Sequence, residues 1–156
     1  MSKEESFKLS LLNFVTEKQG IDYLIAEQTG FFLIDKETKR VLLDKLNISH
    51  SYLRSFDMVF IPRMKGIIFK EQFIETHLDE LIFVELKTTK KYLPESPKGF
   101  FFGATEKEFN FGKLVGDKFK FCLVCLNPES PSYTMLTIDE LDKIVKIKRI
   151  QYQINL

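Results

Sequence analysis

The sequence predicts an α/β (α+β) fold, in which helices flank a central sheet of mixed strand direction. Two observations lead to this fold class. Several apolar runs with the character of β-strands follow one another, and a helical capping signature then precedes a further apolar strand. A helical crossover is how a chain returns to a parallel neighbour, so both strand directions are expected in one sheet. With 156 residues and 44% apolar side chains, the chain is expected to form a single domain over residues 1–156.

The first expected elements are an amphipathic helix and a β-hairpin. Apolar residues at spacings of three and four predict a helix over residues 6–18, which Gly20 is expected to end. Two apolar runs then surround the polar residues 35–39, which predicts a hairpin turn, although the second run could equally begin a short helix. The helical stripe consists of Phe7, Leu11, Phe14 and Val15.

Two strands are expected in the middle of the chain. Residues 56–61 have the composition of a strand, and Pro62 closes the run. Residues 81–87 form a mostly apolar run that is typical of a buried strand. The segment between them, residues 63–80, is mixed and predicts a connection with some structure of its own.

Helices and strands alternate in the last third of the chain. Thr105 and Glu108 form a capping box that predicts a helix to about residue 115, where Gly116 would end it. Residues 118–128 predict a strand. Thr137 and Glu140 repeat the capping signature before a short helix, and residues 148–156 alternate like a last strand.

Composition and missing motifs exclude several classes of protein. No apolar run reaches the ~18 residues of a membrane-spanning helix, and the N-terminus lacks the apolar core of a signal peptide, so a cytoplasmic protein with no membrane association is expected. The sequence contains no phosphate-binding glycine loop, nucleophile elbow or dinucleotide fingerprint, which argues against an ATPase, an α/β-hydrolase and a dinucleotide enzyme. A net charge of +1 means that any nucleic-acid surface must be local.

The segment Glu85-Leu86-Lys87 contains the most informative charges. Side chains alternate along a strand, so Glu85 and Lys87 should point to one face, and Val84 and Leu86 to the other. An unpaired buried carboxylate or ammonium costs several kcal/mol. The face that carries Glu85 and Lys87 is therefore expected to be wet, ion-paired or metal-bound.

Together with Asp57 on the earlier strand, this segment resembles the active site of the PD-(D/E)XK nuclease superfamily, which has the restriction-endonuclease-like fold. In that pattern an Asp from one strand meets an acid-x-Lys from the next, and a loop, a helix and a strand follow, as they do here. The resemblance covers a motif core at about residues 55–127. Asp57 follows Phe56 where the family name has Pro, and Asp79 is a rival acid, expected at the start of the same strand as Glu85.

The resemblance implies a Mg²⁺-dependent nuclease that hydrolyses phosphodiester bonds in DNA, in restriction, repair or a mobile element. Asp57, Glu85 and Lys87 would be the catalytic residues. The metal, Mg²⁺ or Mn²⁺, would be held by Asp57, Glu85 and the backbone carbonyl of Leu86, since hard cations prefer oxygen ligands. Lys87 would orient or activate water, and Glu17 on the first helix would be an additional acid.

The partner implied by the resemblance is DNA, with RNA as the alternative nucleic acid, and a homodimer would supply symmetry and further surface. A segment that bears hydroxyl and basic groups directly follows the motif and suits phosphate contacts. The three phenylalanines of residues 99–103 either stack on bases or pack into the core. The phosphate-contacting segment consists of Thr88, Thr89, Lys90 and Lys91.

Two other functions are compatible with the same residues. A nuclease-fold module without catalytic activity could bind nucleic acid or a protein partner, and the near-neutral charge fits such a module at least as well. Alternatively, Glu85 and Lys87 could form a plain ion pair on a strand of an unrelated α/β binding domain. A response to Mg²⁺ would distinguish a metal site from an ion pair.

Overall fold

A computed structural model describes the backbone of residues 3–156 and the side chains from Val15 onward. A mixed five-stranded sheet lies at the centre of this part of the chain. The strands are β1 (Phe31–Leu33), β2 (Met58–Phe60), β3 (Ile82–Thr89), β4 (Phe119–Cys125) and β5 (Ser132–Leu136), and they lie in this order across the sheet. The α-helices are α1 (Lys3–Glu27), α2 (Lys36–Lys45), α3 (Ile74–His77), α4 (Glu106–Val115) and α5 (Ile138–Ile144). Short 3₁₀ helices are formed by His50–Tyr52, Glu71–Phe73 and Gly116–Lys118.

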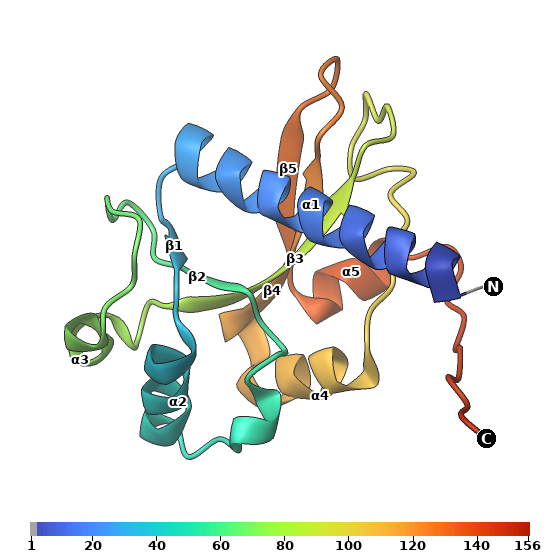
Figure 1. Cartoon of the computed structure of the whole chain (residues 1–156). Coiled ribbons are helices and arrows are strands. Elements are labelled where there is room, and N and C mark those ends of the chain that lie inside the picture. The colour runs from blue at the N-terminus through green and yellow to red at the C-terminus, as the bar shows by residue number, and fades with distance from the viewer. Residues whose placement is uncertain (1–2) are drawn as a thin grey trace.

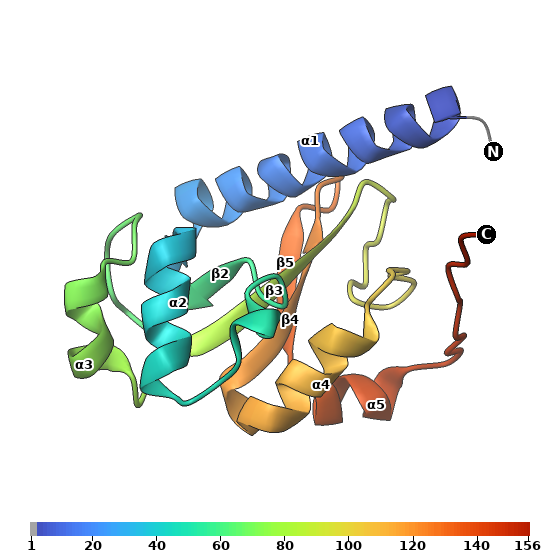
Figure 2. The ribbon, with the colours of Figure 1, turned by 60° about the horizontal axis from the view of Figure 1, so that its bottom comes forward.

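The helices form layers on both faces of the sheet. Helix α1 crosses one face, whereas α2, α4 and α5 lie on the other (Figures 1 and 2). The core is divided accordingly. Leu24 of α1 packs with the strand residues Val84 and Leu86, and a larger cluster rich in phenylalanine joins the sheet to Leu43 of α2 and Phe111 of α4.

Strand β3 joins the two halves of the sheet. It pairs antiparallel with β2 and parallel with β4, and the crossover between β3 and β4 contains α4. This arrangement confirms the expected mixed α/β sheet with flanking helices. Strand β5 pairs antiparallel with β4 and was not expected from the sequence. None of the described helices is long and apolar enough to cross a membrane.

The first helix does not end at Gly20, contrary to the expectation. Helix α1 continues to Glu27, and Gly20 is buried where the helix crosses β3. A Cβ at Gly20 would lie 2.6 Å from Thr88 Cγ2 and 3.2 Å from Leu86 Cδ2, so the glycine allows a close approach of helix and strand. Val15 is 46% exposed. The other members of the expected apolar stripe, Phe7, Leu11 and Phe14, have side chains outside the described residues.

The hairpin expected around residues 35–39 was wrong, and its alternative, a short helix, is present. Asp35 is the N-cap of α2, and its Oδ1 accepts a hydrogen bond of 2.7 Å from Thr38 N. An N-cap aspartate satisfies a backbone donor that the first helical turn leaves free, so the polar stretch begins a helix and does not close a turn. Strand β1 pairs with β2 instead.

Both capping boxes are present, but the last expected strand is absent. Thr105 caps α4 and Thr137 caps α5, each together with the glutamate three residues later, and Gly116 ends α4 as expected. Residues 148–156 form neither helix nor strand, and Ile150 and Tyr152 are each 79% exposed. Alternation of apolar and polar residues makes a strand only where another strand supplies hydrogen bonds, and none does so here.

Candidate functional site

The two faces of β3 differ as its alternation predicts. Val84 and Leu86 pack against α1, whereas Glu85 and Lys87 lie on the face that α4 covers. Lys87 Nζ is 3.5 Å from Glu85 Oε1. The strand therefore presents a carboxylate and an ammonium group side by side, and both side chains are largely buried.

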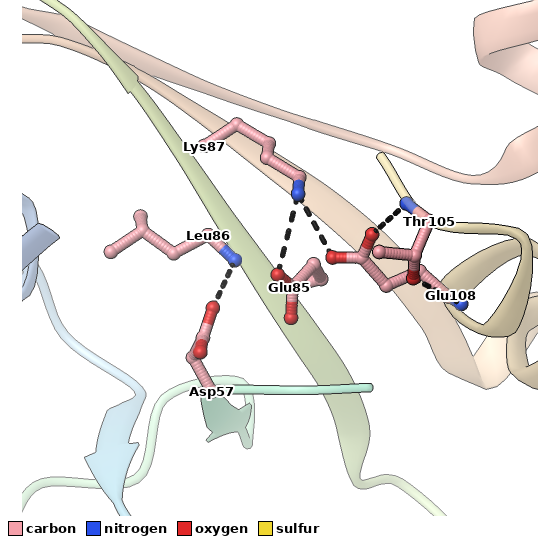
Figure 3. A network of polar contacts seen from close by, with 6 residues as sticks. All are labelled: Asp57, Glu85, Leu86, Lys87, Thr105 and Glu108. Carbon is pink, nitrogen blue, oxygen red and sulfur yellow. Dashed lines mark hydrogen bonds and ion pairs between the residues drawn. The ribbon is translucent and has the colours of Figure 1, made fainter. Parts of the chain in front are cut away.

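Asp57 contacts β3 on both sides of Glu85. Its backbone N donates to the carbonyl of Val84 at 2.8 Å, and its Oδ2 accepts from Leu86 N at 2.8 Å (Figure 3). The regular pairing of β2 with β3 stops at Met58 and Val84, so Asp57 lies where the two strands diverge. The structure thus brings Asp57, Glu85 and Lys87 together.

Glu108 completes the polar network, and sequence reasoning missed this role. Its Oε1 accepts a hydrogen bond of 2.9 Å from Lys87 Nζ, while its Oε2 accepts from Thr105 N (Figure 3). The capping box was visible in the sequence and explained Glu108 as a helix cap. Nothing in that local pattern indicates that the same carboxylate also binds a lysine from β3.

The buried carboxylates differ in charge state. Burial and the neighbouring Asp57 raise the pKa of Glu85 to about 11, and its buried Oε2 has no hydrogen-bond partner among the described side chains. For Glu108, burial favours the neutral form, but hydrogen bonds with Glu85, Lys87 and Thr105 outweigh it and hold the pKa below its usual value. In the absence of a further cation, Glu85 keeps its proton and Lys87 pairs with an ionised Glu108.

Two more charged side chains face this network. Glu17 on α1 is exposed, but partial desolvation and the nearby Asp57 raise its pKa, so the expected additional acid lies beside Asp57. Lys39 of α2 donates through Nζ to the carbonyl of Phe56 at 2.6 Å and to that of Leu53 at 3.2 Å. Burial lowers its pKa, while the charges of Asp57, Glu85 and Glu17 oppose that shift. Lys39 was not expected, because its position depends on how α2 docks.

The oxygen atoms of this site fit a hard divalent cation. The unpartnered Oε2 of Glu85 and the carboxylate of Asp57 are suitable ligands. The N–H of Leu86 points toward Asp57, and because the N–H and C=O of a strand residue point the same way, its carbonyl faces the same edge. Among the described residues, no three His, Cys, Asp or Glu side chains form a metal-binding group. A cation would therefore need the backbone carbonyl or water in addition to the two carboxylates.

The expected phosphate-contacting segment divides into two parts. Thr88 packs against α1 at Gly20, on the face opposite Lys87, and Thr89 Oγ1 accepts from the backbone N of Lys91. The side chains of Lys90 and Lys91 are exposed at the end of β3. Thr88 and Thr89 are half-buried, and Thr89 shares the face of β3 that carries Glu85 and Lys87.

The rival acid Asp79 lies at the other end of β3. It is exposed in the turn before the strand begins at Ile82, and its carbonyl accepts a hydrogen bond from Lys118 Nζ. Asp79 precedes β3, whereas Glu85 and Lys87 lie in the middle of the strand, so Asp79 does not join the network that contains Asp57.

Comparisons with known proteins leave the chain without an assigned family. No family model matches the sequence, no curated protein matches it, and no solved structure matches its fold. The functional argument therefore depends on the residues and geometry of this site.

Proposed function

We propose that the protein is a Mg²⁺-dependent nuclease that hydrolyses phosphodiester bonds in DNA. One observation carries the proposal: Asp57 holds β3 at Leu86, directly beside Lys87 and a buried Glu85 whose Oε2 has no hydrogen-bond partner in the described part of the chain. The order α1, β1, β2, β3, α4 and β4, with α2 inserted before β2 and α3 before β3, and with β3 and β4 parallel, supports a restriction-endonuclease-like fold.

Each residue of the site has a task in this proposal. Asp57, Glu85 and the Leu86 carbonyl would hold the metal, which polarises a phosphoryl oxygen and lowers the pKa of bound water. Lys87 would donate a hydrogen bond to the attacking water or to the phosphate, and its charge would stabilise the negative charge that develops there. Glu108 would position Lys87, and Lys39 would hold the chain that precedes Asp57 through the carbonyl of Phe56.

A nuclease-fold module without catalytic activity is the second candidate. The ion pair between Lys87 and Glu108, together with the raised pKa of Glu85, favours it, because a protonated Glu85 and a paired lysine need no metal. Such a module would bind DNA through Lys90 and Lys91. The two candidates differ in whether the site responds to Mg²⁺.

The decisive experiment measures cleavage of plasmid, linear and single-stranded DNA with Mg²⁺, Mn²⁺ or EDTA. We expect cleavage with either metal and none in EDTA. Lys87→Ala should reduce the rate by roughly 100-fold or more, because a group that stabilises developing charge contributes on that scale. Binding of metal to the folded protein should also raise the melting temperature by mass action.

Lys65→Ala is the matched control, because Lys65 is an exposed lysine outside the network. It should cleave like the wild type. Full activity of Lys87→Ala would contradict the proposed catalytic site. No cleavage of any substrate, together with no thermal shift by metal, would favour the inactive module.

A further inference from the structure

The connection between β3 and α4 joins the two sides of the candidate site and is itself well anchored. It leaves β3 just after Lys87 and reaches α4 just before Glu108. Leu93 within it is 5% exposed, and its backbone N donates to Ser130 Oγ at 3.1 Å. The backbone N of Phe100 donates to the carbonyl of Pro97 at 2.9 Å. Side chains on this connection are therefore presented on a folded loop.

One of the three consecutive phenylalanines of this loop points into solvent. Phe102 packs on Phe121 of β4 at 5.5 Å between ring centroids, and Phe100 packs against Phe102 at 6.1 Å. Phe101 between them is 90% exposed. The core-packing interpretation thus holds for Phe100 and Phe102 only. Phe101 thus stays in water between two partly buried neighbours and lacks the favourable free energy that burial of an aromatic ring normally gives.

Phe101 lies close to the start of α4, which carries Glu108 of the candidate site. Phe101 precedes Thr105 by four positions, so their Cα atoms lie within about 14 Å, the length of a fully extended chain. That distance corresponds to roughly four base steps of about 3.4 Å along one strand. The same loop begins with the exposed lysines Lys90 and Lys91, and Lys98 is exposed next to the aromatic run.

We infer that Phe101 stacks on an unpaired base of a DNA strand whose phosphates contact Lys90 and Lys91. This inference rests on the proposed function, since it assigns to that site a substrate with a single-stranded or opened segment. An aromatic ring and neighbouring lysines are the two components by which proteins bind single-stranded DNA without reading its sequence. Bases inside an intact duplex cannot stack on a side chain unless they leave the helix.

The test measures binding separately from cleavage. Fluorescence anisotropy of a labelled single-stranded oligonucleotide in EDTA gives Kd for the wild type, Phe101→Ala, Phe101→Leu and Phe101→Tyr. We expect Kd to rise roughly 5- to 100-fold for Phe101→Ala, the range found when one stacked aromatic is removed. Phe101→Leu should bind as weakly, because it keeps an apolar group without a ring, whereas Phe101→Tyr should bind like the wild type.

The controls separate this inference from the proposed function. Because Phe101 is exposed, its variants should keep the wild-type melting temperature, and the Kd for a fully paired duplex should change less than that for the single strand. An unchanged Kd in Phe101→Ala, or full binding by Phe101→Leu, would overturn base stacking. If no DNA is cleaved but Phe101→Ala weakens binding in EDTA, the proposed catalysis fails and the stacking stands.

Discussion

Two helices of this protein begin with the same capping box, yet only one of these boxes contributes to the candidate site. In α4, Glu108 N donates to Thr105 Oγ1 at 3.1 Å, and in α5, Glu140 N donates to Thr137 Oγ1 at 3.1 Å. Glu108 is 5% exposed and also binds Lys87, whereas Glu140 is exposed. The local structure is the same, and the surroundings differ.

The comparison separates what a motif does from what its location adds. A threonine and a glutamate three residues apart satisfy the free N–H groups of a first helical turn anywhere in a fold. Glu108 gains its second partner because α4 packs over the face of β3 that carries Glu85 and Lys87. The capping box of α5 faces solvent, and its glutamate does no more than cap the helix.

The largest difference between the two capping boxes should be in the pH dependence of stability, because Glu108 lies beside the buried Glu85 and Glu140 does not. The pKa of Glu85 is about 11 in the folded chain, while the unfolded chain releases this proton near the ordinary value of 4.5. Folding therefore takes up a proton, and the free energy of unfolding should decrease as pH rises above about 4.5, by up to ~1.4 kcal/mol per pH unit. Glu85→Gln should remove most of this decrease, and the raised pKa of Glu17 accounts for the remainder. Urea denaturation in EDTA between pH 5 and pH 8 measures the slope.

Glu140→Gln is the control for this pH effect and should keep the wild-type slope, since its carboxylate is exposed. The lowered pKa of Glu108 acts in another window, because its contribution to stability is present above about pH 4.5 and is lost on acidification below it. A wild-type stability that does not fall between pH 5 and pH 8 would show that Glu85 is ionised in the folded chain.

A smaller effect is expected on cleavage when the two glutamates are removed in turn. Glu108→Ala should reduce the cleavage rate by roughly 10- to 100-fold, because a residue that orients a group of the site contributes on that scale. Glu140→Ala should cleave like the wild type. Initial rates with Mg²⁺ on one DNA substrate give the comparison. Equal rates for both variants would mean that the contact between Lys87 and Glu108 has no part in the reaction.

The smallest effects on stability and cleavage are expected when the two N-cap threonines are replaced. Thr105→Ala and Thr137→Ala each remove one cap, so each should lower the free energy of unfolding by about 1 kcal/mol. Only Thr105→Ala should also slow cleavage, because it loosens the start of α4 beside Glu108. Thermal denaturation and cleavage rates of the two variants test this directly. A slower reaction in Thr137→Ala would show that loss of stability alone accounts for the effect.

Patterns that depend on neighbouring residues were predictable from the sequence. The caps of α4 and α5 involve positions three apart, and the shared face of Glu85 and Lys87 follows from alternation along one strand. These features need no knowledge of the remaining fold. The resemblance to a nuclease motif then indicated Asp57, which the structure brings next to Glu85.

Features that depend on docking were not predictable. Gly20 reads as a helix stop but lies inside α1, because the helix crosses β3 closely at that point. Lys39 belongs to the site only because α2 packs beside the chain before Asp57. Residues 148–156 alternate like a strand, but no strand in the described residues 3–156 pairs with them. In each case the missing information is which surface the segment meets.

The contacts that assemble the site connect distant parts of the chain, and this has a consequence for folding. The Asp57 to Leu86 bond spans 29 residues, and the Lys87 to Glu108 bond spans 21. Such non-local contacts form only after the intervening loops have closed, which makes them slow compared with helix formation. During refolding, helical signal should therefore return before the site is complete. If the proposed nuclease activity is present, it would report on the last steps of folding.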